Sequence, residues 1–360
     1  MKVKEICEYG IKSKVKAGEG LTEGKYKFFT SSAEANKFVN EYQFDKPGII
    51  MGTGGNATLH YCDTPFSVST DCIVLFPKDK LITKYLYYFF RGNFHILENG
   101  FKGAGLKHTS KKYINEIKIK KIPIQAKQEQ IIDVLDNIED IITRKKQQLL
   151  EYDQLIKSRF VEMFGNPIKN DKEWKLKFLD EVCDVRDGTH DSPKYYNVGY
   201  PLITSKNISN GNIDYSTAQL ICEEDYQNIN KRSKVDNGDI LMPMIGTVGG
   251  AIIVRKERDF AIKNVALIKF NTKLVENTFI KYVLNSDQMN LHFEDLKKGG
   301  TQKFIGLKTI RNLPIIVPPI KLQSQFATFV QQVDKLKFEV QKSLDESQTL
   351  FDSLMQEYFG

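Results

Sequence analysis

Glu-x-Lys pairs are the residues of this sequence that come nearest to the spacing of a metal-dependent nuclease site. Glu116 stands two positions before Lys118, and Glu173 stands two positions before Lys175. Such a site needs clustered carboxylates to hold its metal ions. No Pro-Asp dipeptide precedes either pair, so we interpret both pairs as chance and predict no nuclease site here.

The double proline in VPPI (317–320) is the one candidate for the loop with which a DNA methyltransferase holds a target amino group. That loop has Asn or Asp before the prolines and an aromatic residue after them, and both are missing here. The segments GTGG (52–55) and GTVGG (246–250) lack the spacing of a dinucleotide-binding or phosphate-binding loop and favour tight turns between strands. We therefore expect no cofactor on this chain.

The five cysteines form no Cys-x-x-Cys pair. Cys62 and Cys72 could be metal ligands, but no second pair accompanies them, so buried free thiols are the simpler interpretation. A Ser-His-Asp or Cys-His site with distant members would leave no spacing to detect, and nothing in the sequence marks one. The sequence thus predicts no metal site and no catalytic residue.

Basic residues gather in two similar places, although the net charge of +7 is modest. Residues 102–121 hold seven lysines and one acid, and residues 297–311 hold five basic residues and no acid. A single cluster would be interpreted as a solvated surface. Two clusters favour two contacts with a polyanion.

These clusters belong to a repeat with an offset of 195 residues. The aligned pairs are Gln128 and Gln323, Ile131 and Phe326, Leu135 and Val330, Leu149 and Leu344, and Phe164-Gly165 and Phe359-Gly360. Further upstream the offset shifts by one, which aligns Gly103 with Gly299 and Lys107 with Lys303. So long a period indicates two copies of a globule-plus-helix unit rather than a solenoid.

Residues 126–164 and 321–359 are predicted to form two long helices, since neither contains Gly or Pro. Steps of four and three residues give ten seam positions in each helix, eight of them apolar, with Lys145 and Lys337 as polar interruptions. The positions are Ile131, Leu135, Ile138, Ile142, Lys145, Leu149, Tyr152, Ile156, Arg159 and Met163 in the first helix and Phe326, Val330, Val333, Lys337, Val340, Leu344, Ser347, Phe351, Leu354 and Tyr358 in the second. This is a coiled-coil pattern, and each helix, at ~58 Å, needs a partner. We expect the two helices of one chain to pair antiparallel; a dimer between chains is the alternative.

The remaining segments, 1–122 and 166–317, are predicted to be α+β globules with long loops. GDILMPMIG (238–246), GAIIVRK (250–256) and VALIKFN (265–271) are typical of strands. TKYLYYFFRGNFHIL (83–97) and TFIKYVLNSDQMNLHF (278–293) are typical of helices packed on a sheet. The expected domains are therefore 1–122 and 166–317, with spacer helices at 123–165 and 318–360, related by a pseudo-two-fold axis.

No apolar run is long enough to cross a bilayer, and the opening MKVKEICEYG lacks the apolar core of a signal peptide. A cytoplasmic location is the expectation.

Four segments in this order resemble the specificity subunit of type I restriction-modification enzymes. They are FVEMFGNP (160–167), EWKLKFLDEVCDVRDGTHDSP (173–193), GDILMPMIGTVGG (238–250) and GGTQKFIGLKTIRNLPIIVPPIKLQSQ (299–325). The resemblance covers nearly the whole chain. It implies two target recognition domains, each binding one half of a split sequence in double-stranded DNA, and paired helices that act as a spacer.

The resemblance further implies that this chain is not an enzyme. Methyltransferase subunits would dock on the helices and methylate adenine with S-adenosylmethionine, and motor-nuclease subunits would use ATP and magnesium to cleave. One departure from the repeat is that KFLDEVCD (177–184) aligns with MKVKEICE (1–8), so the first copy has no EWKL segment. The first domain is either a compact variant or trimmed at the start codon.

Base recognition needs hydrogen-bonding side chains on loops, and phosphate contacts need lysines. The candidates for base contact are Ser31, Ser32, Asn56, Thr58, Thr189, His190, Ser205, Asn207 and Gln302. The candidates for phosphate contact are Lys102, Lys107, Lys206, Lys297, Lys298 and Lys303. His190 has an equal alternative as an exposed residue in a turn shaped by Asp187 and Gly188.

Two other functions remain open at this point. A self-contained DNA-modifying enzyme or nuclease would turn over DNA without added subunits. A free-standing DNA-binding regulator would bind its site alone and would recruit nothing through the helices.

Overall fold

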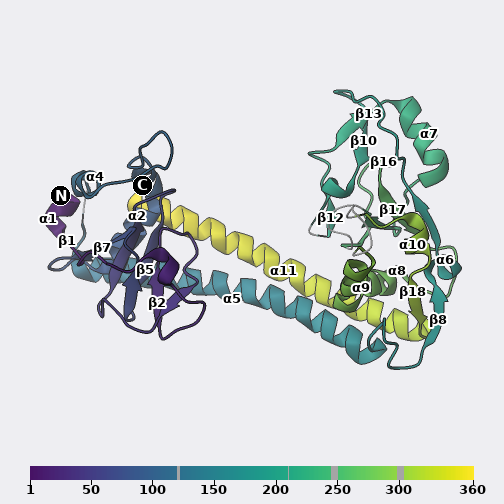
Figure 1. Ribbon diagram of the computed structural model, residues 1–360, viewed down its shortest axis with the longest axis horizontal. Coiled ribbons are helices and arrows are strands. Elements are labelled where there is room, and N and C mark those ends of the chain that lie inside the picture. Colours follow the sequence, from purple (N-terminus) through teal and green to yellow (C-terminus); the bar gives the residue numbers. More distant parts are fainter. Residues whose placement is uncertain (120–121, 210, 245–249, 298–303) are drawn as a thin grey trace. The chain divides into compact units, whose positions relative to one another are not determined.

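The computed structural model of the protein describes residues 1–119, 122–209, 211–244, 250–297 and 304–360. The chain forms two compact units, one made of Met1–Gln147 with Gln341–Gly360 and the other of Gln148–Val340. Each unit is a mixed globule of strands and short helices that packs on parts of the long helices (Figure 1). Residues 246–249 of the predicted segment GTVGG (246–250) lie outside the described residues.

The first unit begins with a one-turn helix, continues with short strands and ends with short helices before α5. Its elements are α1 (Val3–Ile6), β1 (Cys7–Tyr9), the 3₁₀ turn η1 (Ala17–Glu19), β2 (Tyr26–Phe29), β3 (Lys37–Val39), β4 (Gly48–Gly52), β5 (Leu59–Cys62), β6 (Phe66–Val68), β7 (Cys72–Pro77), α2 (Thr83–Gly92), α3 (Phe94–Glu98) and α4 (Lys111–Glu116).

The second unit adds a strand at its start and several short elements in its loops. Its elements are β8 (Lys175–Phe178), α6 (Leu179–Val182), β9 (Asp184–Asp187), β10 (Tyr200–Ile203), the 3₁₀ turn η2 (Ser205–Asn207), β11 (Ile208–Ser209), β12 (Asn212–Ile213), β13 (Gln219–Ile221), α7 (Glu223–Ser233), β14 (Ile240–Pro243), β15 (Ile252–Ile253), β16 (Ala261–Ile262), β17 (Val265–Lys269), α8 (Asn277–Leu284), α9 (Asp287–Lys297), α10 (Leu307–Arg311) and β18 (Pro314–Val317).

The two units have the same sheet topology. The larger sheet has the order β1-β7-β4-β5 in the first unit and β9-β17-β14-β15 in the second, antiparallel throughout. The smaller sheet has the order β3-β2-β6 and β13-β10-β16, with one antiparallel and one parallel pair in each. The duplication inferred from the sequence is confirmed at the level of strand order.

The units differ where the sequence repeat differs. In the second unit β8 pairs with β18 over four residues of each strand. In the first unit Lys2 and Lys118 form an antiparallel bridge, and the Ile119 backbone N–H donates to the Met1 carbonyl at 2.8 Å. The EWKL segment thus lengthens a strand whose first-unit counterpart is one bridge long.

Two buried glutamines connect each globule to the start of its long helix. Both are at most 1 % exposed, so their amides need internal partners. The Gln128 Oε1 accepts from the Ile82 N–H, just before α2, and its Nε2 donates to the carbonyls of Lys80 and Pro123. In the same way, the Gln323 Oε1 accepts from the Glu276 N–H, just before α8, and its Nε2 donates to the carbonyls of Leu274 and Pro318. The aligned glutamines therefore have the same structural role.

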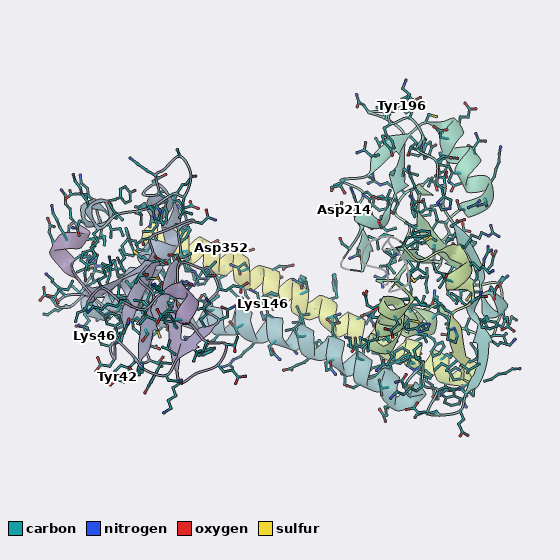
Figure 2. The ribbon with its side chains drawn as sticks, in the orientation of Figure 1. Tyr42, Lys46, Lys146, Tyr196, Asp214 and Asp352 are labelled. Carbon is teal, nitrogen blue, oxygen red and sulfur yellow. The ribbon has the colours of Figure 1, made fainter. Side chains whose placement is uncertain are left out.

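The long helices are α5 (Gln125–Phe164) and α11 (Ile320–Phe359), each beginning one residue before its predicted start. All twenty predicted seam residues are buried or half-buried, and Lys146 and Asp352, which lie between them, are exposed (Figure 2). The predicted seam is therefore confirmed, although Phe160 and Met355, between seam positions near the ends of the helices, are buried as well. At the end of α5, Gly165 has φ +74°, a conformation that a side chain disfavours, and its N–H donates to Val161.

Within each unit the two helices run antiparallel. In the second unit Lys337 donates to Asp153, and Phe326, earlier in α11, packs on Phe164, later in α5. In the first unit the Lys145 ammonium donates to Ser343 and Ser347 of α11 at 2.6–2.8 Å. Both lysines that interrupt the seam are thus neutralised or hydrogen-bonded across it.

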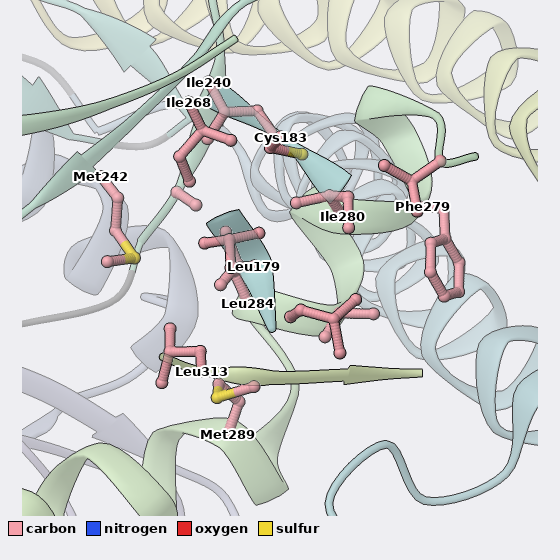
Figure 3. Close-up of a cluster of buried hydrophobic side chains, with 14 of the residues drawn as sticks. Leu179, Cys183, Ile240, Met242, Ile268, Phe279, Ile280, Leu284, Met289 and Leu313 are labelled. Carbon is pink, nitrogen blue, oxygen red and sulfur yellow. The ribbon is translucent and has the colours of Figure 1, made fainter. Parts of the chain in front are cut away.

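The core of the second unit continues into the helix pair. Phe164 and Phe326, both fully buried, pack edge-to-face on each other, and Phe164 does the same on Phe279 of α8 at 4.8 Å. Figure 3 shows the rest of this cluster, where Leu179 and Cys183 meet side chains from α8, α9 and the larger sheet. Four of the five cysteines are buried, and all five are free thiols.

The expected helices at 83–97 and 278–293 are each two helices. Asn93 separates α2 from α3, and Asn285-Ser286 separates α8 from α9. The asparagines cap the preceding helix, because both donate their backbone N–H to its last carbonyls. Among the described residues, no helix is long and apolar enough to cross a membrane.

Candidate nucleic-acid interface

Several candidate residues of the first unit meet at one edge, around the loop that joins β4 to β5. Ser31 follows β2, and its hydroxyl donates to the Asp71 carbonyl at 2.7 Å. The Thr53 hydroxyl donates to the same carbonyl at 2.9 Å. The Gly55 N–H donates to the Lys107 carbonyl at 2.9 Å. Four segments that are distant in sequence, around residues 31, 53–55, 71 and 107, are therefore held together.

The exposed candidates at this edge are Ser32, Asn56, Lys102 and Lys107. The backbones of Lys102 and His108 exchange two hydrogen bonds of 3.0 Å, which closes the lysine-bearing loop into a small hairpin. Thr58 differs from these residues because it is 6 % exposed and accepts a hydrogen bond from the Gly52 N–H. Its placement supports a role in shaping the loop and not a base contact.

The second unit gathers its candidates at the ends of β9, β10 and β16. Thr189 follows β9 and bridges to Lys263, which follows β16. The Lys263 N–H donates to the Ile203 carbonyl at 2.9 Å, and Ser205 and Lys206 come directly after that strand. Because β10 and β16 are parallel, their ends carry these polar residues to the same edge.

Asn207 is the second candidate that lies inside the protein. It is 4 % exposed, and its Oδ1 accepts from the backbone N–H and hydroxyl of Thr204. Its Nδ2 donates to Asp214 and Thr217. With both ends of the amide occupied, Asn207 holds the loop between β10 and β13 and has no free group for a base.

The basic candidates of the second cluster are only partly described. Lys298, Gln302 and Lys303 lie outside the described residues. Lys297 is the last residue of α9.

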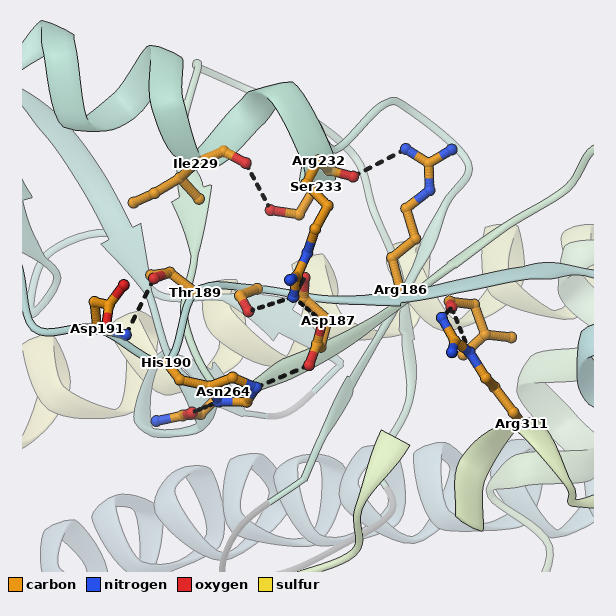
Figure 4. Close-up of polar contacts among 12 residues, drawn as sticks. Arg186, Asp187, Thr189, His190, Asp191, Ile229, Arg232, Ser233, Asn264 and Arg311 are labelled. Carbon is orange, nitrogen blue, oxygen red and sulfur yellow. Dashed lines mark hydrogen bonds and ion pairs between the residues drawn. The ribbon is translucent and has the colours of Figure 1, made fainter. Parts of the chain in front are cut away.

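A carboxylate that was not among the candidates organises the second edge. Asp187 lies at the end of β9 and is 7 % exposed. Its Oδ1 accepts a hydrogen bond from Arg232 of α7, and its Oδ2 lies 2.9 Å from the His190 Nε2 (Figure 4). The His190 Nδ1 lies 2.7 Å from Oδ1 of Asn264. The sequence signal for Asn264 would have been its position between two apolar strands, at a turn where its φ is +53°.

The loop approaches the smaller sheet so closely that residue 188 must be glycine. A Cβ on Gly188 would lie 2.2 Å from the Ile262 carbonyl oxygen. This contact lets the Thr189 N–H donate to Ile262 and brings His190 to Asn264. The prediction of a turn at Asp187 and Gly188 is wrong, because the backbone continues from β9 through Gly188 into the bridge between Thr189 and Lys263. The exposed imidazole of His190 lies beyond it and is bonded on both nitrogens.

The hydrogen bond with Asn264, and then that with Asp187, raises the pKa of His190 above its ordinary value of 6.5. The imidazolium is the form stabilised by folding, so its contribution is complete below that value and is lost as the pH rises through the higher folded pKa. We expect the stability difference between the wild type and His190→Ala to shrink as the pH rises from about 6 to about 8. Urea unfolding across this range measures it. The change in this stability difference should be small, because the His190 side chain is 56 % exposed. A stability difference that does not vary with pH would contradict the prediction.

Comparisons with known proteins agree with this geometry. The profile of the family described as "Type I restriction modification DNA specificity domain" matches residues 1–152 and 171–347. The chain is 22 % identical to the type I restriction enzyme MjaVIII specificity subunit of Methanocaldococcus jannaschii, over 88 % of this chain and 78 % of that protein. It is 23 % identical to the EcoBI specificity subunit of Escherichia coli, over 92 % and 76 % of the two chains.

Solved structures show the same fold. The S subunit of the type I restriction-modification system from M. genitalium superposes with a TM-score of 0.66 and covers 100 % of this chain and 95 % of its own, at 14 % identity. A second structure, from a study of the assembly of the type I restriction-modification system, gives a TM-score of 0.59 at 15 % identity.

Proposed function

The chain belongs to the type I restriction modification DNA specificity family, and from this premise we propose that each of its two units recognises one half of a split DNA sequence. It is a specificity subunit, and its role is DNA sequence recognition. The observation that supports two readers is the repeated edge. In the first unit the loops after β2, β4 and α3 come together, and in the second unit the ends of β9, β10 and β16 come together; each edge carries hydroxyl, amide and lysine groups.

The candidate groups at these edges suit the two parts of DNA recognition. Exposed lysines such as Lys107 and Lys206 would neutralise phosphates, a contact that fixes register without reading sequence. Neutral donors and acceptors such as Ser32, Asn56 and Ser205 would reach base edges. The paired helices α5 and α11 would set the number of base pairs between the two half-sites.

The chemistry would come from partner chains. Methyltransferase subunits docked on the helices would use S-adenosylmethionine, and motor-nuclease subunits would use ATP and magnesium. This chain would remain a non-catalytic, cytoplasmic subunit that selects where they act.

The test is to sequence methylated DNA from cells that carry the gene and from cells in which it is deleted. We expect one split adenine-methylated sequence that disappears with the gene. Turnover of DNA by the purified chain alone, with magnesium and S-adenosylmethionine, would show instead a self-contained enzyme. Loss of the gene with no change in methylation would favour a free-standing regulator.

Neighbouring residues of η2 should differ in their effects on binding. Lys206→Ala is expected to weaken binding to cognate and random DNA alike and to lower the slope of log affinity against log salt by about one unit. Ser205→Ala is expected to cost ~1–3 kcal/mol on the cognate site and little on random DNA, if the hydroxyl contacts a base. Salt titrations with both duplexes measure the two effects. Equal losses on both duplexes for Ser205→Ala would remove it from the base-contact set.

A further inference from the structure

The hydrogen bonds around His190 fix where its protons lie. Asp187 also forms an ion pair with Arg232, so its side chain is a carboxylate, which accepts hydrogen bonds and cannot donate one. The His190 Nε2 therefore carries a proton and donates to Asp187 across 2.9 Å. Among the described residues, the charged groups that face the imidazole are Asp187 from β9 and Arg232 from α7.

The second ring nitrogen then determines the orientation of the Asn264 amide. When Nδ1 is protonated, it donates to Oδ1 of Asn264, which is the arrangement at 2.7 Å in the structure. When Nδ1 is unprotonated, it can only accept, so the amide must rotate by half a turn and donate from Nδ2. Either state keeps one hydrogen bond between the two side chains. The bond from the imidazolium is the stronger one because its donor is charged, which agrees with the raised pKa of His190.

The amide has one end on the imidazole and the other end directed away from it. With imidazolium, the outward end is the NH₂ group, which only donates. With neutral imidazole, the outward end is the carbonyl oxygen, which only accepts. Asn264 is half-buried and lies in the turn between β16 and β17, beside Lys263, at the edge that carries Thr189, Ser205 and Lys206.

We propose that Asn264 is a base-reading residue of the second unit and that the protonation state of His190 sets whether it reads acceptors or donors. This rests on the proposed function, since it needs this edge to face DNA. An outward NH₂ group matches the acceptors of guanine or thymine in the major groove, and an outward oxygen matches the N4 amino group of cytosine. The paired contact of asparagine with adenine is excluded, because it needs both ends of the amide. Adenine carries both an acceptor, N7, and a donor, the N6 amino group, so it would take a single bond from either orientation and does not report the change.

Two substitutions separate the role of Asn264 in base contact from the role of His190 in the pH dependence. Asn264→Asp presents an acceptor at every pH, and aspartate tolerates the positive φ that asparagine adopts here. His190→Ala removes the titrating group and leaves both ends of the Asn264 amide free. A matched control is Asn237→Asp, because Asn237 accepts from the Lys256 N–H and precedes β14, at the opposite end of the larger sheet from Asn264.

The experiment selects binding sites from a library of DNA duplexes with a randomised half-site, using the full chain in complex with its methyltransferase subunits. Selection is done at about pH 5.5 and about pH 8.5, on either side of the ordinary histidine pKa. We expect one position of the wild-type half-site to shift from guanine or thymine toward cytosine as the pH rises, by about 10-fold or more in relative affinity. Asn264→Asp should prefer cytosine over guanine at both pH values, and Asn237→Asp should behave as the wild type.

His190→Ala should lose the pH dependence and gain adenine at that position. If the wild type selects a defined half-site but Asn264→Asp and His190→Ala select the same one at both pH values, the inference is wrong while the proposed function stands. If the wild-type complex selects no sequence at all, the proposed function fails, and the inference fails with it.

Discussion

Exchanging residues 179–310 for the corresponding segment of another type I specificity subunit is expected to change one half of the methylated sequence and to leave the other half unchanged. The exchanged segment lies entirely within the second unit, Gln148–Val340. Recognition by separate units should contribute independent free-energy terms, which add when no residues are shared. The result would be a complete replacement of one half-site and not a graded loss.

The structure defines where this exchange should begin and end. Residues 179–310 leave β8 and β18, which pair with each other, in the parent chain. The donor must keep an aromatic residue in place of Phe279, because that ring packs on Phe164 and completes the buried cluster with Phe326. A replacement segment with a small residue at this position would leave a cavity that lowers the free energy of unfolding by about 3–5 kcal/mol.

Sequencing of methylated DNA from cells carrying the parent and the exchanged chain measures both halves in one experiment. The gap between the half-sites should stay constant, because α5 and α11 are unchanged. A matched control exchanges the same segment with that of a subunit sharing the parent's second half-site, and it should leave the sequence unaltered. A change in both halves at once would rule out two independent readers.

Ile138→Asp is expected to destabilise the first unit by about 3–5 kcal/mol. Ile138 is a seam residue of α5 and is 9 % exposed, so an aspartate there would place a charge in the helix interface. Lys145, the nearest seam cation along α5, is already bound to Ser343 and Ser347. Thermal unfolding of the purified chain and co-purification with methyltransferase subunits measure the loss, and we expect both the melting temperature and assembly to fall.

Ile141→Asp is the matched control for this change. It is the same substitution three residues along the same helix, at a side chain that is 44 % exposed. A charge there stays in water, and surface substitutions usually change stability by less than about 0.5 kcal/mol. Equal melting temperatures for the two variants would contradict the assignment of Ile138 to the seam.

The sequence alone determined the elements that follow from local chemistry and spacing. The absence of Gly and Pro fixed both long helices to within one residue at their starts, and the alternation of four and three gave seam residues that are all buried or half-buried. The offset of 195 predicted that Gln128 and Gln323 are equivalent, and they make equivalent hydrogen bonds. Such patterns are readable because periodicity reports which face is buried.

Residue type was a weaker guide to the candidate site. Thr58 and Asn207 have the chemistry of base-contacting residues, but both are buried and hydrogen-bonded within their loops. Asp187 and Asn264 lie 77 positions apart in the sequence, and both bind His190. No local pattern connects them, because the contact exists only through the pairing of β9 with β17 and of the loops beyond.

The tertiary structure also decided how the repeat is divided. The sequence copies are a globule followed by its own helix, but each compact unit combines one half of α5 with one half of α11. A heptad pattern specifies the face that a helix buries and leaves open both the partner and its direction. Because the helices pair antiparallel, the end of α11 packs in the first unit and the end of α5 packs in the second unit. Each globule therefore completes its core with residues from both sequence copies.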